Sequence, residues 1–117
     1  MNLSEFAGKN YLLLLFVPEA STPEYIDQWN LLYRNGNGVA ARDLLVLSFF
    51  EEEGGDFDGD EISEADTEAI RRQFRIKTGW AAAVLVGKDG KEKARYPMPA
   101  ALDAIFNAID RLRIADK

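Results

Sequence analysis

The chain of 117 residues contains no cysteine and no histidine, and these two absences decide which chemistry it can perform. Without cysteine it has no disulfide, no thiol nucleophile and no Cys-ligated metal, so thiol-disulfide oxidoreductase and peroxidase activities are excluded. Without histidine it has neither Ser-His-Asp nor Cys-His catalysis, and no His-ligated metal. The side chains left for chemistry are those of the carboxylates, lysine, arginine, tyrosine, serine and threonine.

A polar segment, Ser21-Thr22-Pro23-Glu24, separates an apolar run from a helical pattern. Ser-x-x-Glu is the spacing of a capping box, in which Ser21 Oγ accepts from the Glu24 N–H and the Glu24 carboxylate accepts from the Ser21 N–H. Pro23 suits the first helical turn. The alternative is a binding role, because ligands favour the end of a first strand whose neighbours lie on opposite sides. Glu19 and Glu24 would repel an anionic ligand there.

The acidic, glycine-rich segment 51–61 predicts a solvated loop, with a metal site as the alternative. Its aspartates alternate like the first ligands of a calcium-binding EF-hand: Asp56, Asp58 and Asp60. With Asp56 at position 1, however, Glu61 stands where that loop needs glycine and Thr67 where it needs glutamate. The EF-hand pattern therefore fails, and only a weak cation site remains open.

Two basic segments have simple structural interpretations. The first predicts a solvated helix face, with basic residues at Arg71, Arg72, Arg75 and Lys77. The second, GKDGK at 87–91, lacks the glycine spacing of a phosphate-binding loop and predicts a hairpin turn.

The elements that must position these residues follow from hydrophobic patterning. Apolar or alternating runs predict strands at 11–17, 43–50, 81–87 and 92–97. Helical periodicity predicts helices at 22–35, 63–76 and 100–114, after a short helical lead-in at 3–9. Ser63 is the expected cap of the second helix, and the glycines at 36 and 38 are expected to end the first.

The order strand-helix-strand-helix-strand-strand-helix predicts one α/β domain over residues 1–117. The first crossover should be right-handed and join parallel strands. The hairpin makes the last two strands antiparallel, so the predicted sheet is mixed, has four strands and carries helices on both faces.

Three stretches carry a resemblance to a known family: Leu12–Pro18, Arg42–Val46 and Val84–Gly90. Together they resemble a bacterial thioredoxin-like family of unknown function that lacks the CxxC motif, over residues 10–114. The resemblance implies a thioredoxin-like fold that is redox-inactive, with Ser21–Glu24 in the place of Cys-Gly-Pro-Cys. The segment 78–81, Thr-Gly-Trp-Ala, lacks the cis-proline that thioredoxins have there, so their peptide-docking backbone is not carried over.

Charge and hydropathy narrow the range of partners. The net charge of −6, from 14 basic and 20 acidic residues, argues against nucleic-acid binding. The apolar run at 11–17 is too short to span a bilayer, so no membrane partner is expected. The first ten residues lack a signal-peptide pattern, which predicts a cytoplasmic protein. No cofactor is expected, and the oligomeric state is left open.

The sequence therefore predicts a non-enzymatic domain that binds a protein or peptide, or serves as a scaffold. The expected binding surface consists of Glu19, Ser21, Thr22, Pro23, Glu24, Gly79, Trp80 and Ala81. In a thioredoxin-like fold Trp80 would lie close to Ser21, where an exposed tryptophan is typical of a binding hot spot. A Trp80 that is simply packed is the alternative at this position. The alternative functions are a carboxylate-based enzyme, with or without a metal, and a weak calcium-binding module.

Overall fold

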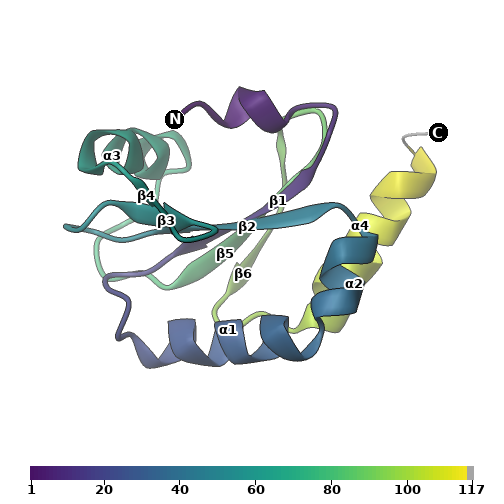
Figure 1. Cartoon of the computed structure of the whole chain (residues 1–117), viewed down its shortest axis with the longest axis horizontal. Helices are drawn as coiled ribbons and strands as arrows, with labels where there is room; N and C mark the ends of the chain where they lie inside the picture. The colour runs from purple at the N-terminus through teal and green to yellow at the C-terminus, as the bar shows by residue number, and fades with distance from the viewer. Residues whose placement is uncertain (116–117) are drawn as a thin grey trace.

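The protein contains one sheet of six strands: β1 (Tyr11–Phe16), β2 (Leu44–Phe49), β3 (Gly55–Phe57), β4 (Asp60–Ile62), β5 (Ala82–Val86) and β6 (Glu92–Pro97). The structure is a computed structural model and describes residues 1–115. The strand order is β4-β3-β2-β1-β5-β6 (Figure 1). β1 and β2 are parallel, and every other neighbouring pair is antiparallel, so the sheet is mixed as predicted.

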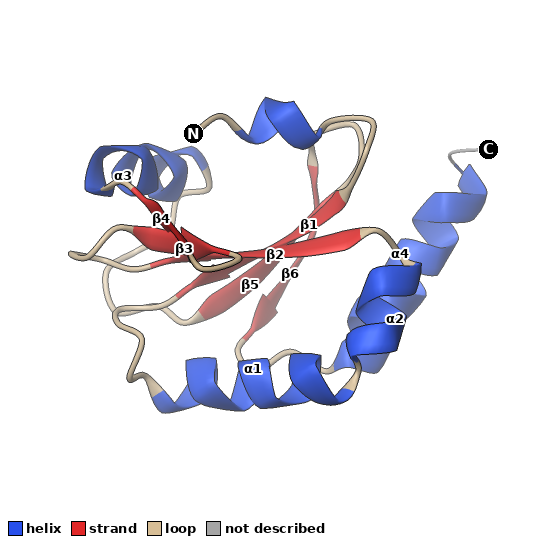
Figure 2. Ribbon diagram, viewed as in Figure 1, coloured by secondary structure: helices blue, strands red, loops and turns tan. Residues whose placement is uncertain are grey.

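Helices cover both faces of this sheet (Figure 2). They are the 3-10 helix η1 (Leu3–Phe6) and the α-helices α1 (Pro23–Arg34), α2 (Gly36–Ala41), α3 (Glu64–Gln73) and α4 (Leu102–Ala115). η1 and α3 pack on one face, and α1, α2 and α4 pack on the other. Within residues 1–115, no helix combines the length and the apolar character that a membrane crossing requires.

Strand β1 lies in the middle of the sheet and is buried along its whole length. Its side chains alternate between two cores. Leu13 and Leu15 join the core beneath α1 and α4, whereas Leu12 and Leu14 join the core beneath α3. A strand that is covered on both faces needs an uninterrupted apolar run, which explains the sequence of this segment.

The predicted loop at 51–61 contains the β3–β4 hairpin, so the expectation of four strands was wrong. β3 pairs with the end of β2, where Gly55 lies opposite Phe49. Acidic residues and glycines have low strand propensity, so the pattern alone indicates a loop. The hairpin forms because β2 offers an edge for pairing and because Gly55 permits a close approach. A Cβ at Gly55 would collide with the carbonyl oxygen of Ser48.

Helix α1 begins without the predicted capping box. Its N-cap residue is Thr22, whose side chain makes no capping hydrogen bond. Instead, Thr22 Oγ1 accepts a hydrogen bond from the Glu19 N–H at 3.3 Å within the preceding turn. The box does not form because the helix begins at Pro23, one residue later than a cap at Ser21 requires.

The other helix ends confirm two expectations and correct one. Ser63 Oγ accepts a hydrogen bond from the Asp66 N–H at 3.1 Å, so the predicted cap of α3 is confirmed. α1 ends at Arg34, directly before the glycines that were expected to end it, and these glycines then begin the additional helix α2. α4 begins at Leu102, two residues later than expected, after Pro99 and the cis peptide bond that precedes it.

Candidate functional site

Three loops meet at one end of the sheet. Phe16, at the end of β1, lies opposite Phe49 of β2 and Ala82 of β5. The loops that follow β1 and β2 and the loop that precedes β5 therefore leave the sheet at the same edge (Figure 1). Because β2 and β5 flank β1 on opposite sides, this edge is a topological switch point, where ligands of open α/β sheets commonly bind.

The eight residues of the predicted binding surface lie on these loops and in the first turn of α1. We call them the strand-end surface: Glu19, Ser21, Thr22, Pro23, Glu24, Gly79, Trp80 and Ala81. Thr22, Glu24 and Ala81 are half-buried, and the other five are exposed. The surface is therefore accessible, while its role in binding stays a prediction.

Glu51 connects the two halves of the strand-end surface. Its backbone N–H donates to the carbonyl oxygen of Pro18 at 3.1 Å, which fixes the loop after β1. Its carboxylate accepts the Gly79 N–H, with both oxygens at 3.2 Å, which fixes the loop before β5. The sequence does not single out Glu51, because it stands within a run of three glutamates and nothing in the local pattern distinguishes one from another.

Trp80 is the large aromatic residue of the strand-end surface, and its exposed fraction is 43%. The Lys77 ammonium lies 5.3 Å from the centroid of its ring. The backbone N–H of Trp80 donates to the Lys77 carbonyl oxygen at 3.1 Å, so the loop that carries the ring is hydrogen-bonded at two points. Trp80 is thus only partly packed, while its predicted approach to Ser21 stays a prediction.

Carboxylates surround a hollow beside this surface, but they do not form a metal site. The hollow measures about 280 Å³ and is lined by Pro18, Glu19, Glu51, Glu52 and Glu53. Within residues 1–115, no group of three or more acidic side chains is arranged to hold a metal ion. Asp56 lies in β3, Asp58 in the turn and Asp60 in β4, so their alternation does not produce a ligand cluster. The structure does not support the cation site.

Arg71 departs from the solvated basic face that the sequence predicts, because its exposed fraction is only 8%. Burial lowers the pKa of its guanidinium, and the negative charge of Glu51 opposes that shift. Its Nη1 atom has no hydrogen-bond partner among the described residues. Arg71 and Glu51 both line a hollow of about 340 Å³. The buried positive charge of Arg71 therefore lies at the same hollow as Glu51, whose hydrogen bonds join the two loops.

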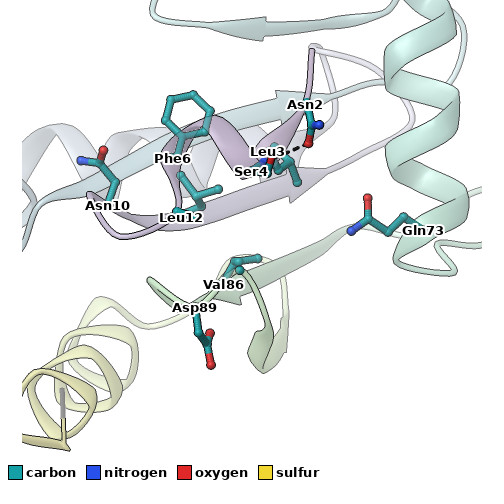
Figure 3. A pocket seen from close by; sticks show the side chains of 12 residues that line it. Asn2, Leu3, Ser4, Phe6, Asn10, Leu12, Gln73, Val86 and Asp89 are labelled. Atoms are coloured by element: carbon teal, nitrogen blue, oxygen red, sulfur yellow. Dashed lines mark hydrogen bonds between the residues drawn. The ribbon is translucent and has the colours of Figure 1, made fainter.

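A further hollow, of about 290 Å³, lies at the opposite end of the sheet, beside the start of β1 and the end of β5. Figure 3 shows the side chains that line it. Its polar groups largely serve the fold. Asn2 Oδ1 accepts the Ser4 N–H at 3.0 Å, and Asn10 Nδ2 donates to the Asp43 carbonyl oxygen at 3.2 Å. Asp89 accepts hydrogen bonds from the Lys91 N–H and the Lys93 ammonium of the same hairpin. We therefore assign no function to this hollow.

Fold and site together define a thioredoxin-like α/β domain that has no cysteine. The chain belongs to the family described as "Domain of unknown function (DUF4174)", which matches residues 2–116.

Curated relatives include the "Sushi repeat-containing protein SRPX2" of Xenopus laevis, which is 30% identical over 111 residues. The human protein of that name is 26% identical over 111 residues. Each alignment covers 92% of this chain and 24% of the relative, so the chain spans about a quarter of their length. These relatives are vertebrate proteins, and the bacterial origin expected from the resemblance stays a prediction.

Solved structures confirm the thioredoxin-like fold. The reduced 2-Cys peroxiredoxin of Plasmodium vivax is similar with a TM-score of 0.75 and 19% identity, covering 99% of this chain and 85% of that one. The thioredoxin domain of a thiol-disulfide oxidoreductase from Bacteroides vulgatus is similar with a TM-score of 0.69 and 15% identity, covering 96% and 84%. Identities this low show the fold alone.

Proposed function

We propose that this chain is a redox-inactive thioredoxin-like domain that binds a partner protein or peptide, or serves as a scaffold, through the strand-end surface. The observation that carries the proposal is Trp80, whose exposed fraction is 43%. Its loop is tied by Gly79 to the carboxylate of Glu51. An aromatic side chain on a restrained loop loses little conformational freedom on binding, which is why such residues dominate protein interfaces.

The curated relatives favour a domain that works as part of a longer protein over an enzyme that is complete by itself. The matching region is 24% of the relatives' length, so in those proteins the domain is one part of a longer chain. The calcium module gains no support from the described residues, which contain no group of three or more acidic side chains arranged for a metal. The carboxylate-based enzyme stays an alternative prediction. A cytoplasmic location and the absence of nucleic-acid and membrane partners stay predictions.

The substitution Trp80→Ala should strongly reduce capture of the partner. The tagged full chain, its Trp80→Ala variant and an Ile114→Ala control would be used to capture proteins from extracts of the native cells, with quantification by mass spectrometry. Ile114 is a suitable control because it is another exposed large apolar residue, with an exposed fraction of 73%, and lies on α4. Loss of a hot-spot aromatic should reduce capture by about tenfold or more.

Thermal unfolding followed by circular dichroism would first establish that both variants are folded. The proposal requires partners that are lost with Trp80→Ala and retained with Ile114→Ala. Equal capture by the wild type and the Trp80→Ala variant would contradict it, as would partners that depend equally on both residues.

A further inference from the structure

A second surface lies between α1 and the β3–β4 hairpin (Figure 1). It is a groove of about 460 Å³, which we call the aromatic groove, and its main lining residues are Tyr25, Ile26, Trp29, Tyr33, Asp56 and Asp58. It shares no residue with the strand-end surface, so the inference drawn from it is independent of the proposed function.

Aromatic side chains at every fourth residue of α1 form one wall of the groove. The Trp29 ring centroid lies 6.4 Å from that of Tyr25 and 5.3 Å from that of Tyr33. The Tyr25 end of the row is fixed, because its hydroxyl donates to the buried Ser48 Oγ at 2.8 Å and its ring contacts Phe50 at 5.5 Å between centroids. The row is therefore a pre-formed set of ring faces.

The other end of the row is open to solvent. Tyr33, at that end, has an exposed fraction of 77%. Ile26, which lines the groove beside Tyr25, has an exposed fraction of 50%. The buried side chains of this helix are Gln28 and Leu32. Apolar and aromatic surface is thus left exposed at a hollow, which is typical of a binding site.

The facing wall carries negative charge. Asp56 and Asp58 line the groove, and no lysine or arginine is among its described lining residues. Neither aspartate makes an ion pair within the described part of the chain. A cation is therefore favoured by the carboxylates, and the ring faces add a second attraction for it. Arginine suits both walls, because its planar guanidinium stacks on aromatic rings and pairs with carboxylates.

The length of the groove fits a segment of polypeptide chain as its occupant better than a small cation. Tyr25 and Tyr33 are eight residues apart on one helix, which corresponds to about 12 Å. Four residues of an extended peptide cover about 13 Å, and alternate side chains of such a peptide point to the same side. The geometry points to an arginine-containing, extended basic segment of a partner protein as the occupant of the aromatic groove.

The test uses the peptide acetyl-Gly-Arg-Gly-Arg-Gly-amide and a matched peptide with citrulline in place of both arginines. Citrulline keeps the size of the side chain and removes its charge. The chain has two tryptophans, so nuclear magnetic resonance gives one indole N–H signal for the groove, from Trp29, and one for the strand-end surface, from Trp80. The inference requires a saturable shift of the Trp29 signal by the arginine peptide and little shift by the citrulline peptide.

Two double variants separate the groove from general electrostatics. Asp56→Asn with Asp58→Asn should weaken peptide binding by about tenfold, whereas Asp60→Asn with Glu61→Gln changes the net charge equally within the same hairpin and should change binding by less than about twofold. Tyr33→Ala should weaken binding by about threefold through loss of one ring face.

Equal weakening by the two double variants would overturn the inference, as would equal binding of the citrulline peptide. A shift of the Trp80 signal alone would also overturn it, since the peptide would then bind at the strand-end surface. A shift of the Trp80 signal alone would not contradict the proposed function. Conversely, loss of partner capture by Trp80→Ala tests the strand-end surface and not the aromatic groove.

Discussion

At the scale of single residues, Gln28 shows how a polar side chain can hold the core together. It lies on α1 and is fully buried. Its Oε1 accepts the Ala100 N–H at 2.6 Å, and its Nε2 donates to the Ala100 carbonyl oxygen at 3.2 Å. One amide thus satisfies both backbone groups of a buried residue and joins α1 to the segment that precedes α4.

The substitution Gln28→Leu should lower the free energy of unfolding by about 2 to 4 kcal/mol, because two buried backbone groups would lose their partners. Urea denaturation followed by circular dichroism measures the change. Gln73→Leu serves as the control, since Gln73 is exposed and the same substitution there should cost less than about 0.5 kcal/mol. Similar losses in the two variants would contradict this role of Gln28.

At the scale of elements, Arg42 anchors the short helix α2 to α4. Its Nε and Nη2 donate to the two carboxylate oxygens of Asp110, each at 3.0 Å. Its Nη1 donates to the Gly38 carbonyl oxygen at 3.0 Å, and the guanidinium lies 4.1 Å from the Phe106 ring centroid. Because α2 is glycine-rich and has low intrinsic helix propensity, this anchor helps to maintain it.

Arg42→Lys should lower the free energy of unfolding by about 1 kcal/mol, since lysine cannot reproduce the paired hydrogen bonds. The matched control is Arg72→Lys, whose ion pair with Glu68 is largely exposed and should matter by less than about 0.5 kcal/mol. Chemical denaturation of both variants measures the difference. An effect of equal size at the two positions would rule out a special role for Arg42.

The turn between β5 and β6 should contribute a pH-dependent part of the stability. A hydrogen bond from the Lys93 ammonium at 2.6 Å, with one from the Lys91 N–H at 3.0 Å, holds the pKa of Asp89 below its ordinary value of 3.8. Because the pKa is lowered in the folded state, the stabilisation is present above that ordinary value and is lost as the pH falls through the folded-state pKa.

Asp89→Asn should therefore lower the melting temperature at about pH 7, and the difference from the wild type should shrink at about pH 2. Thermal unfolding at both pH values provides the measurement. A difference that stays constant or grows in acid would contradict the assignment.

At the scale of the whole molecule, sequence patterning predicts the elements whose own side chains form an uninterrupted apolar run or repeat with a clear period. The four long strands, α1, α3 and α4 all belong to this group. The remaining elements depend on neighbours that the local sequence does not reveal. β3 exists because β2 offers an edge, and α2 begins directly after α1 at glycines whose pattern indicated only the end of a helix.

The candidate site likewise has features that the sequence predicts and features that depend on contacts between distant residues. The gathering of the loop after β1 and the loop before β5 at one sheet edge could be predicted from the element order, whereas the sequence left open whether Trp80 is exposed or packed. The linking role of Glu51 could not, because it arises from contacts with Pro18 and Gly79, which are distant in sequence. The aromatic groove could not be predicted from the sequence for a related reason. The apolar residues of α1 repeat with a helical period, but this period does not show which of them the facing β3–β4 hairpin leaves exposed.

The central claim, that the strand-end surface binds a protein partner, is tested most directly by photo-crosslinking in the native cells. The full chain would carry benzoylphenylalanine at position 21, an exposed position of the strand-end surface that leaves Trp80 in place, or, as the control, at the exposed position 114 of α4. We expect a discrete protein adduct that forms at position 21 and is absent at position 114. No adduct at position 21, or the same adducts at both positions, would contradict the claim.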